Sequence, residues 1–279
     1  MMFGRIVNIL LVLAVPVFLT GLISCRKNKE VDLKPDVNSA NAIVLAHSNL
    51  KYVFDLLLKA GNDSALRATG HSRIDSSAVT LDSLAHGLYF DFVNTLCPDS
   101  IIRNGRVQVI YNGKIFHKGY SAAITFIGYN VDLDTYTGTD SLVNLGVNDR
   151  KAWVYSCSLP DGGIKKGVEG GTAVYSIKGF ITLDSVAIAN LQNPVWFVSG
   201  TINGVTSYGD SFSAVITNPL AEVFQCPWIK YGRISVSVAN ADIQNGSIDF
   251  IDDTGCDAAT TYNFGGNVFN NTGMKHYLP

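Results

Sequence analysis

The sequence lacks a basic excess and the local motifs of common hydrolases. Its 21 Lys and Arg residues are balanced by 23 Asp and Glu residues, which gives a formal net charge of −2. Nucleic-acid binding depends on a concentrated basic patch, so we exclude a nucleic-acid partner. Neither a Gly-x-Ser-x-Gly elbow nor a His-Glu-x-x-His helix occurs. We therefore predict a protein that is not an enzyme and has no cofactor.

The N-terminus has no apolar run long enough for a transmembrane helix. Arg5 precedes an apolar stretch over residues 6–22, which is interrupted by Asn8 and Pro16. A membrane-spanning helix needs about 20 apolar residues, whereas this shorter pattern is typical of a cleaved secretory signal peptide. We predict that residues 1–24 are the signal peptide.

The signal peptide ends in Leu-Ile-Ser before Cys25, which resembles the bacterial lipobox. The resemblance implies that Cys25 carries diacylglycerol and, with a further palmitate-type chain, anchors a lipoprotein to a membrane. Residues 25–39 are polar, contain Pro35 and fit a tether. An aspartate directly after the lipidated cysteine would resemble the signal that retains lipoproteins in the inner membrane. This chain has Arg26 at that position. We therefore expect an outer-membrane lipoprotein, on either its periplasmic or its cell-surface face.

Composition predicts a globular domain after the tether. Hydrophobic residues make up 47% of the chain and charged residues 16%, which is far from a disordered composition. The four remaining cysteines, in an oxidising compartment, allow three disulfide pairings, of which we favour Cys226 with Cys256. A zinc site is disfavoured because no closely spaced Cys or His pair occurs.

The first folded element is expected to be a helix. Between Ser39 and Ala60 apolar residues recur at spacings of three and four, which indicates an amphipathic helix that covers an open face or end of a sheet. Gly61 suits the helix end, where a left-handed conformation is common. Residues 62–83 are rich in Ser, Asp, Gly and Thr, and we expect a long surface connection there.

The rest of the chain shows the pattern of short β-strands. Asn112-Gly113, Asn203-Gly204 and Asn245-Gly246 supply hairpin turns. The predicted fold class is mainly β, an antiparallel sandwich or stacked β meanders with one N-terminal amphipathic helix, over residues 40–279. Residues 151–171 are expected to be a loop that could divide two lobes. The runs rich in β-branched and aromatic residues are 89–93, 106–111, 122–129, 173–183, 195–202, 211–217, 232–238 and 247–251.

Two segments far apart in the chain share one motif. Residues 90–92 read Phe-Asp-Phe and precede Cys97, and residues 248–250 read Ile-Asp-Phe and precede Cys256. With the segment Cys-Pro-Trp-Ile that begins at Cys226, they resemble a family of uncharacterised Bacteroidota lipoproteins. In that family a lipobox and a short helix precede a β region with repeated units of Asp-Phe, turn and cysteine. In that family the cysteine is followed by a basic residue, a glycine and a further strand, and residues 103–106 match this pattern here. The turn before Cys97, however, lacks the glycines that are usual in the family.

The same resemblance suggests a covalent modification. Bacteroidota O-glycosylate exported proteins at Asp-Ser or Asp-Thr followed by a small or aliphatic residue. The alternative is that Asp-Ser forms an ordinary turn or helix cap. The candidate serines are Ser64, Ser83, Ser100, Ser141 and Ser185.

Two further sets of residues suggest a binding site, whereas the histidines do not. An acidic turn over residues 249–257 could gather oxygen ligands for calcium. Its spacing differs from that of an EF-hand, and the alternative is a solvated turn without a metal. Trp153, Trp196 and Trp228 could be platforms for sugar rings or members of a β core. The five histidines are scattered and suggest no catalytic triad. The acidic residues of the turn are Asp249, Asp252, Asp253 and Asp257.

Two functions remain open at the level of sequence. The first is a non-catalytic structural or protein-interaction module anchored to the membrane. The second is a carbohydrate-binding surface lipoprotein, which predicts exposed and coplanar Trp or Tyr rings in a groove. The sequence identifies no ligand or partner for either.

Overall fold

The computed structural model describes residues 34–35, 37–167, 171–183, 195–224, 226, 228–251, 256 and 259–271. The helices are α1 (Val37–Asn62) and α2 (Ser64–Thr69). The strands are β1 (Lys34–Pro35), β2 (His71–Ile74), β3 (Ser77–Asp82), β4 (Gly87–Leu96), β5 (Ile102–Asn112), β6 (Ser121–Val131), β7 (Asp134–Thr137), β8 (Thr139–Val147), β9 (Trp153–Lys165), β10 (Thr172–Leu183), β11 (Val195–Val205), β12 (Ser211–Val223), β13 (Ile229–Val238), β14 (Ile243–Gln244), β15 (Gly246–Phe250), β16 (Thr260–Phe264) and β17 (Asn267–Asn271).

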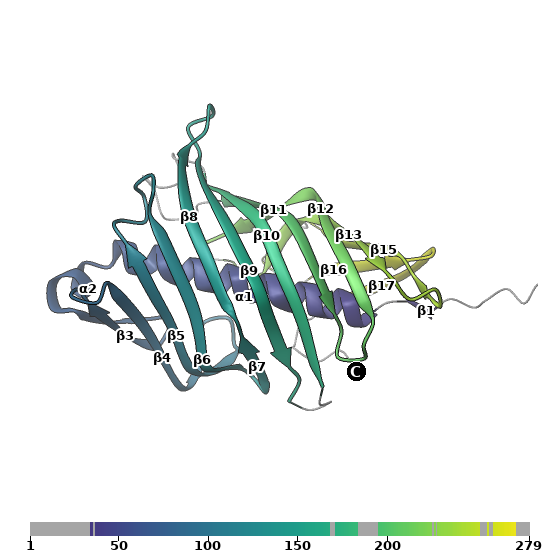
Figure 1. Ribbon diagram of the computed structural model, residues 1–279, viewed down its shortest axis with the longest axis horizontal. Coiled ribbons are helices and arrows are strands. Elements are labelled where there is room, and N and C mark those ends of the chain that lie inside the picture. The colour runs from purple at the N-terminus through teal and green to yellow at the C-terminus, as the bar shows by residue number, and fades with distance from the viewer. Residues whose placement is uncertain are drawn as a thin grey trace, which may run out of the picture. The chain divides into compact units, whose positions relative to one another are not determined.

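Fifteen of the described strands form one antiparallel sheet (Figure 1). Each strand pairs mainly with its neighbours in the chain, from β2 at one edge to β17 at the other. The mainly β prediction is therefore confirmed, and the arrangement is a continuous meander rather than two packed sheets. Buried and exposed residues alternate along most strands, so one face of the sheet forms the core.

Helix α1 runs across the strands on the core face of the sheet (Figure 1). It reaches β16 through a hydrogen bond between Tyr262 and Asn41, β11 through a ring contact between Phe54 and Trp196, and the β2–β3 turn through Lys59. Because β7 and β8 both lie between β6 and β9, a flat sheet with these fourteen strand positions would be about 65 Å wide, but a helix of 26 residues is only about 39 Å long. The sheet must therefore curve around the helix to make all these contacts.

The curvature explains why α1 is buried on all sides. Between residues 39 and 60 only Asn41, Ser48 and Lys59 are partly exposed. The helix was expected over nearly the same residues, but as an amphipathic cover with one polar face. A helix that is enclosed on all sides has no solvent-exposed stripe. Neither helix in the described part of the chain is long and apolar enough to cross a membrane.

Two predictions about connections are wrong. Residues 62–83 are not a long surface connection, because they form α2, β2 and β3. Residues 153–165 are strand β9 rather than a loop between lobes, and the sheet is continuous there. Gly162 lies within this strand, and a side chain at its position would collide with the ring of Tyr175. The folded part also begins a little earlier than predicted, since Lys34 pairs with Ile243.

Candidate functional site

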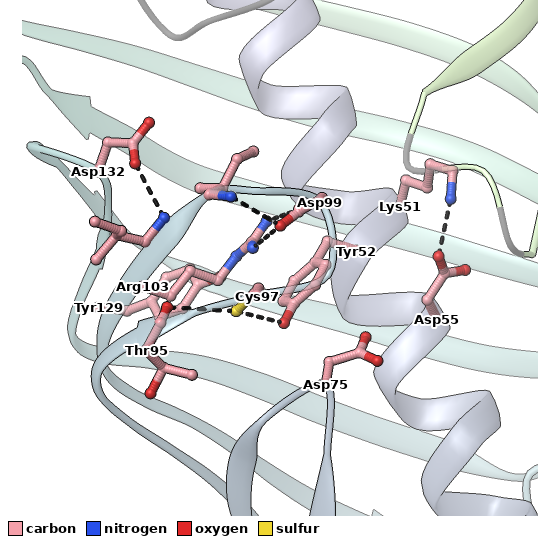
Figure 2. A network of polar contacts seen from close by, with 12 residues as sticks. Lys51, Tyr52, Asp55, Asp75, Thr95, Cys97, Asp99, Arg103, Tyr129 and Asp132 are labelled. Atoms are coloured by element: carbon pink, nitrogen blue, oxygen red, sulfur yellow. Dashed lines mark hydrogen bonds and ion pairs between the residues drawn. The ribbon is translucent and has the colours of Figure 1, made fainter. Parts of the chain in front are cut away.

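Two groups of buried polar side chains lie between α1 and the core face of the sheet. The Arg103 cluster comprises Tyr52, Cys97, Asp99, Arg103 and Tyr129 (Figure 2). The Glu222 cluster comprises Lys51, Asp55, Trp196 and Glu222.

In the Arg103 cluster every charged atom has a partner. Arg103, an inward residue of β5, donates two hydrogen bonds of 2.8 and 2.6 Å to the carboxylate of Asp99. Its Nε donates to the hydroxyl of Tyr129 on β6 at 3.1 Å. Its guanidinium carbon lies 3.5 Å from the centre of the ring of Tyr52, on α1, and the Tyr52 hydroxyl donates to Cys97 Sγ at 3.4 Å. The cluster therefore joins the helix to β5, β6 and the β4–β5 turn.

The backbone beside Arg103 requires a glycine. Gly105 has φ +89°, and a Cβ there would stand 2.0 Å from the carbonyl oxygen of Gly128. Only glycine fits this close approach of two strands. The conformation accompanies a register irregularity in the pairing of β5 with β6 between Asn104 and Arg106.

The polar atoms of the Glu222 cluster are only partly hydrogen-bonded. On α1, Lys51 donates to Asp55 Oδ2 at 2.8 Å, and both side chains are almost fully buried. On the sheet, Trp196 Nε1 donates to Glu222 Oε2 at 2.5 Å. Lys51 Nζ lies 5.2 Å from the centre of the Trp196 ring, which brings the two pairs together. Among the described residues, neither Asp55 Oδ1 nor Glu222 Oε1 has a hydrogen-bond partner.

Burial changes the acidity of these carboxyls. Desolvation raises the pKa of Asp55 to about 6 despite the nearby Lys51, and raises the pKa of Glu222 to about 7. Asp140, buried on β8, behaves in the same way, with a pKa raised to about 7 by desolvation. His47 of α1 shows the opposite effect, since burial lowers the pKa of its ring to about 4. These groups are therefore stabilised in their neutral forms.

The charged side chains of both clusters are shielded from solvent. Lys51, Asp55, Arg103 and Glu222 are each at most 6% exposed, so solvent and a substrate have little access to their side chains. Within the described residues, no group of three or more His, Cys, Asp and Glu residues lies close enough to hold a metal ion.

Neither cluster is predicted from the sequence, although each has a signal in it. Lys51 and Asp55 are four residues apart within a predicted apolar helix, where a helical ion pair would form. Arg103 occupies an inward position of β5, in alternation with Val107 and Val109. A charge at an inward position indicates a buried partner, but the partner's identity depends on the tertiary structure.

The cysteines are arranged as the sequence analysis favoured. The structure contains a disulfide between Cys226 and Cys256, with their Cα atoms 5.6 Å apart. It connects the segment after β12 to the segment between β15 and β16. Cys97 and Cys157 are buried free thiols. The lipidation candidate Cys25 lies outside the described residues.

The two Asp-Phe units have the same local chemistry. Asp91 on β4 forms an ion pair with Arg106, the residue opposite it on β5. Asp249 on β15 forms an ion pair with Arg233, the residue opposite it on β13. In both units the neighbouring aromatic residues point into the core. The motif therefore combines an outward ion pair with inward aromatic packing.

The acidic turn is described only at Asp249. Its carboxylate accepts hydrogen bonds from Arg233 and from the hydroxyl of Ser247, so its charge is already balanced on the outer face of the sheet. The other calcium candidates, Asp252, Asp253 and Asp257, lie outside the described residues.

Four of the five serines proposed for O-glycosylation are exposed. Ser64 begins α2, Ser83 lies in the β3–β4 turn, and Ser100 lies in the β4–β5 turn. Ser141 is an outward residue of β8, which is paired on both sides. Ser185 lies outside the described residues. The preceding aspartates also have structural roles, since Asp63 caps α2, Asp82 caps the β3–β4 turn and Asp99 binds Arg103.

The aromatic and histidine side chains are dispersed. Trp196 is fully buried against Phe54, whereas Trp153 and Trp228 are partly buried. Trp153 packs against Phe116, with ring centres 6.4 Å apart, at the edge of the core. The described histidines are His47 in the core and the exposed His71, His86 and His117, while His276 lies outside the described residues.

Comparison of the chain with protein-family models, with curated proteins and with solved structures gives no match.

Proposed function

We propose that this chain is a membrane-anchored exported lipoprotein that acts as a non-catalytic structural or protein-interaction module. One observation carries the proposal: α1 fills the core face of the sheet and buries the ionisable groups gathered there. Catalysis needs such groups within reach of a substrate. The surfaces left for function are the outer face of the sheet and the connections at its two ends.

The outer face carries exposed apolar rings. Phe197 on β11 and Tyr231 on β13 point away from the core, on either side of Ala221 on β12. Phe180 on β10 adds a third exposed ring. Exposed aromatic residues are enriched at protein interfaces, because they bury a large area with few rotatable bonds.

A photoreactive amino acid at position 197 tests the interaction role in cells that produce the full chain. We expect one discrete crosslinked protein product at this position. Ala68, an exposed residue of α2, is the position for measuring background. Glu222→Gln should leave the product unchanged, because this carboxyl is buried on the opposite, inner face of the sheet. Absence of any product above the background at position 68 would contradict an interaction through this face.

The anchor is tested separately through Cys25. Cys25→Ala should abolish incorporation of a labelled fatty acid and release the protein from the outer-membrane fraction. Retention of both label and membrane association in this variant would contradict the lipoprotein proposal. The address in the outer membrane is supported by the signal sequence, the lipobox resemblance and Arg26.

The carbohydrate-binding alternative is weakened by Trp196, which is 0% exposed and donates its ring hydrogen bond to Glu222. No described feature favours this role over protein interaction.

A further inference from the structure

One end of the sheet carries a concentration of positive charge. Lys114 and Lys118 lie in the β5–β6 connection, and Arg150 and Lys151 lie in the β8–β9 connection. All four side chains are exposed. Because consecutive strands are antiparallel, both connections emerge at the same end of the strands. We call these four residues the basic end.

The two connections are neighbours in space. Gly119 N donates to the carbonyl of Asn144 at 2.9 Å, and Asn144 Nδ2 donates to the carbonyl of Ile115 at 2.7 Å. The β5–β6 connection therefore packs against the last residues of β8. Phe116 of this connection also contacts Trp153, the first residue of β9.

The basic charge is not neutralised locally. Within the described residues no ion pair to any of the four side chains is present. Asp149 is the one acidic residue in the two connections, although the whole chain has a net charge of −2. Exposed apolar side chains flank the charges, since Leu84 in the nearby β3–β4 turn is 96% exposed and Val147 is 52% exposed.

We propose that the basic end is a docking surface for an acidic surface of a protein partner. The proposal rests on the interaction role proposed above and names its partner chemistry. Unpaired cations attract an acidic partner and fix its orientation, while Leu84 and Val147 supply the apolar contact that such interfaces bury at their centre.

The position of the predicted lipid anchor favours a protein, rather than the membrane, as the partner of the basic end. Lys34 pairs with Ile243, in the connection from β13 to β15, at the end of the strands opposite the basic end. A lipid anchor on Cys25 precedes Lys34 by 34 − 25 = 9 residues, which span at most about 30 Å. Strands of 11 residues such as β5 and β6 are themselves about 36 Å long. A short tether at the far end therefore does not bring the basic end to the membrane.

The test places a photoreactive amino acid at position 147 of the full chain, in cells that produce it. We expect a crosslinked protein whose attached peptide is rich in Asp and Glu. The double variant Lys114→Glu with Lys118→Glu should reduce the yield by about tenfold or more. The control is Lys165→Glu with Lys178→Glu, two exposed lysines outside the basic end, which changes the net charge equally and should preserve the yield.

Several results would overturn this proposal. They are no product at position 147, an adduct to lipid or glycan, a partner peptide without acidic residues, or equal loss in the two double variants. Equal melting temperatures of both purified double variants would show that loss of product is not loss of fold. A product at position 197 without one at position 147 would reject the basic end alone, whereas failure at both would also reject the interaction role.

Discussion

The Arg103 cluster and the Glu222 cluster both bury charged groups, but they differ in how completely these groups are hydrogen-bonded. Both place charged side chains between α1 and the sheet, out of contact with solvent. In the first, Arg103 is matched by the two oxygens of Asp99, by Tyr129 and by the ring of Tyr52. In the second, one oxygen each of Asp55 and Glu222 has no partner among the described residues, and the pKa of both carboxyls is raised by burial. A buried charge is therefore retained where its hydrogen bonds are complete, whereas incomplete hydrogen bonding leaves the neutral form of a buried carboxyl relatively favoured.

The largest expected effect is the loss of Arg103. Arg103→Met removes the cation but leaves the buried carboxylate of Asp99, so the free energy of unfolding should fall by about 3–5 kcal/mol. Urea denaturation of the purified protein measures this change. The matched control is Arg106→Met, which breaks the exposed ion pair with Asp91 and should cost about 1 kcal/mol or less. Similar costs for the two variants would contradict the distinction between complete buried bonding and a surface pair.

The next effect concerns the pH dependence of stability. A carboxyl whose pKa is raised on folding binds its proton more tightly in the folded state, so its contribution to stability is present at low pH and lost as pH rises through the folded pKa. For Asp55, Asp140 and Glu222 these folded pKa values are about 6, 7 and 7. The melting temperature should therefore fall by about 5 °C or more between pH 5 and pH 8.

His47 acts in the opposite sense. Its pKa is lowered from 6.5 to about 4 by burial, so its contribution to stability is lost as pH falls through this range. Above pH 5 the three carboxyls lower the stability more than His47 raises it, so the melting temperature is still expected to fall as the pH rises. Glu222→Gln keeps an acceptor for Trp196 and removes one titrating group, so its melting temperature should depend less steeply on pH. Circular dichroism melts of both proteins across this range measure the two slopes, and equal slopes would exclude Glu222 as a source of the dependence.

The smallest effect separates the two contacts that Tyr52 makes. Tyr52→Phe removes the hydroxyl that contacts Cys97 but keeps the ring beneath Arg103, and should lower the free energy of unfolding by less than about 1 kcal/mol. Tyr52→Leu also removes the stacked ring and should cost about 2 kcal/mol more. Urea denaturation at pH 7 compares the variants. A larger loss for Tyr52→Phe than for Tyr52→Leu would assign the stabilisation to the hydroxyl instead.

Some segments of the chain have a loop-like composition but form regular structure, for local reasons. The segment over residues 62–83 has the composition of a loop, yet Asp63 accepts a hydrogen bond from Leu66 N and begins the short helix α2. Strands β2 and β3 are short and rich in Ser and Thr, so their apolar alternation is weak. In β9 the loop-forming residues Gly162 and Gly163 are required by close packing against Tyr175 and Thr137. Composition alone does not distinguish these cases from true loops.

The sequence by itself determined the local elements, because strand alternation, turn residues and helical spacing depend on neighbours within a few positions. It therefore predicted the mainly β fold and the helix that became α1. Only the tertiary structure decided that fifteen strands form one curved sheet, that α1 is enclosed by it, and that Arg103 and Glu222 are buried beside the helix. Those outcomes depend on strand pairing and side-chain contacts between residues far apart in the chain, such as Lys51 with Trp196 and Tyr52 with Arg103. No local pattern encodes such contacts, since each partner is placed by a different element of the fold.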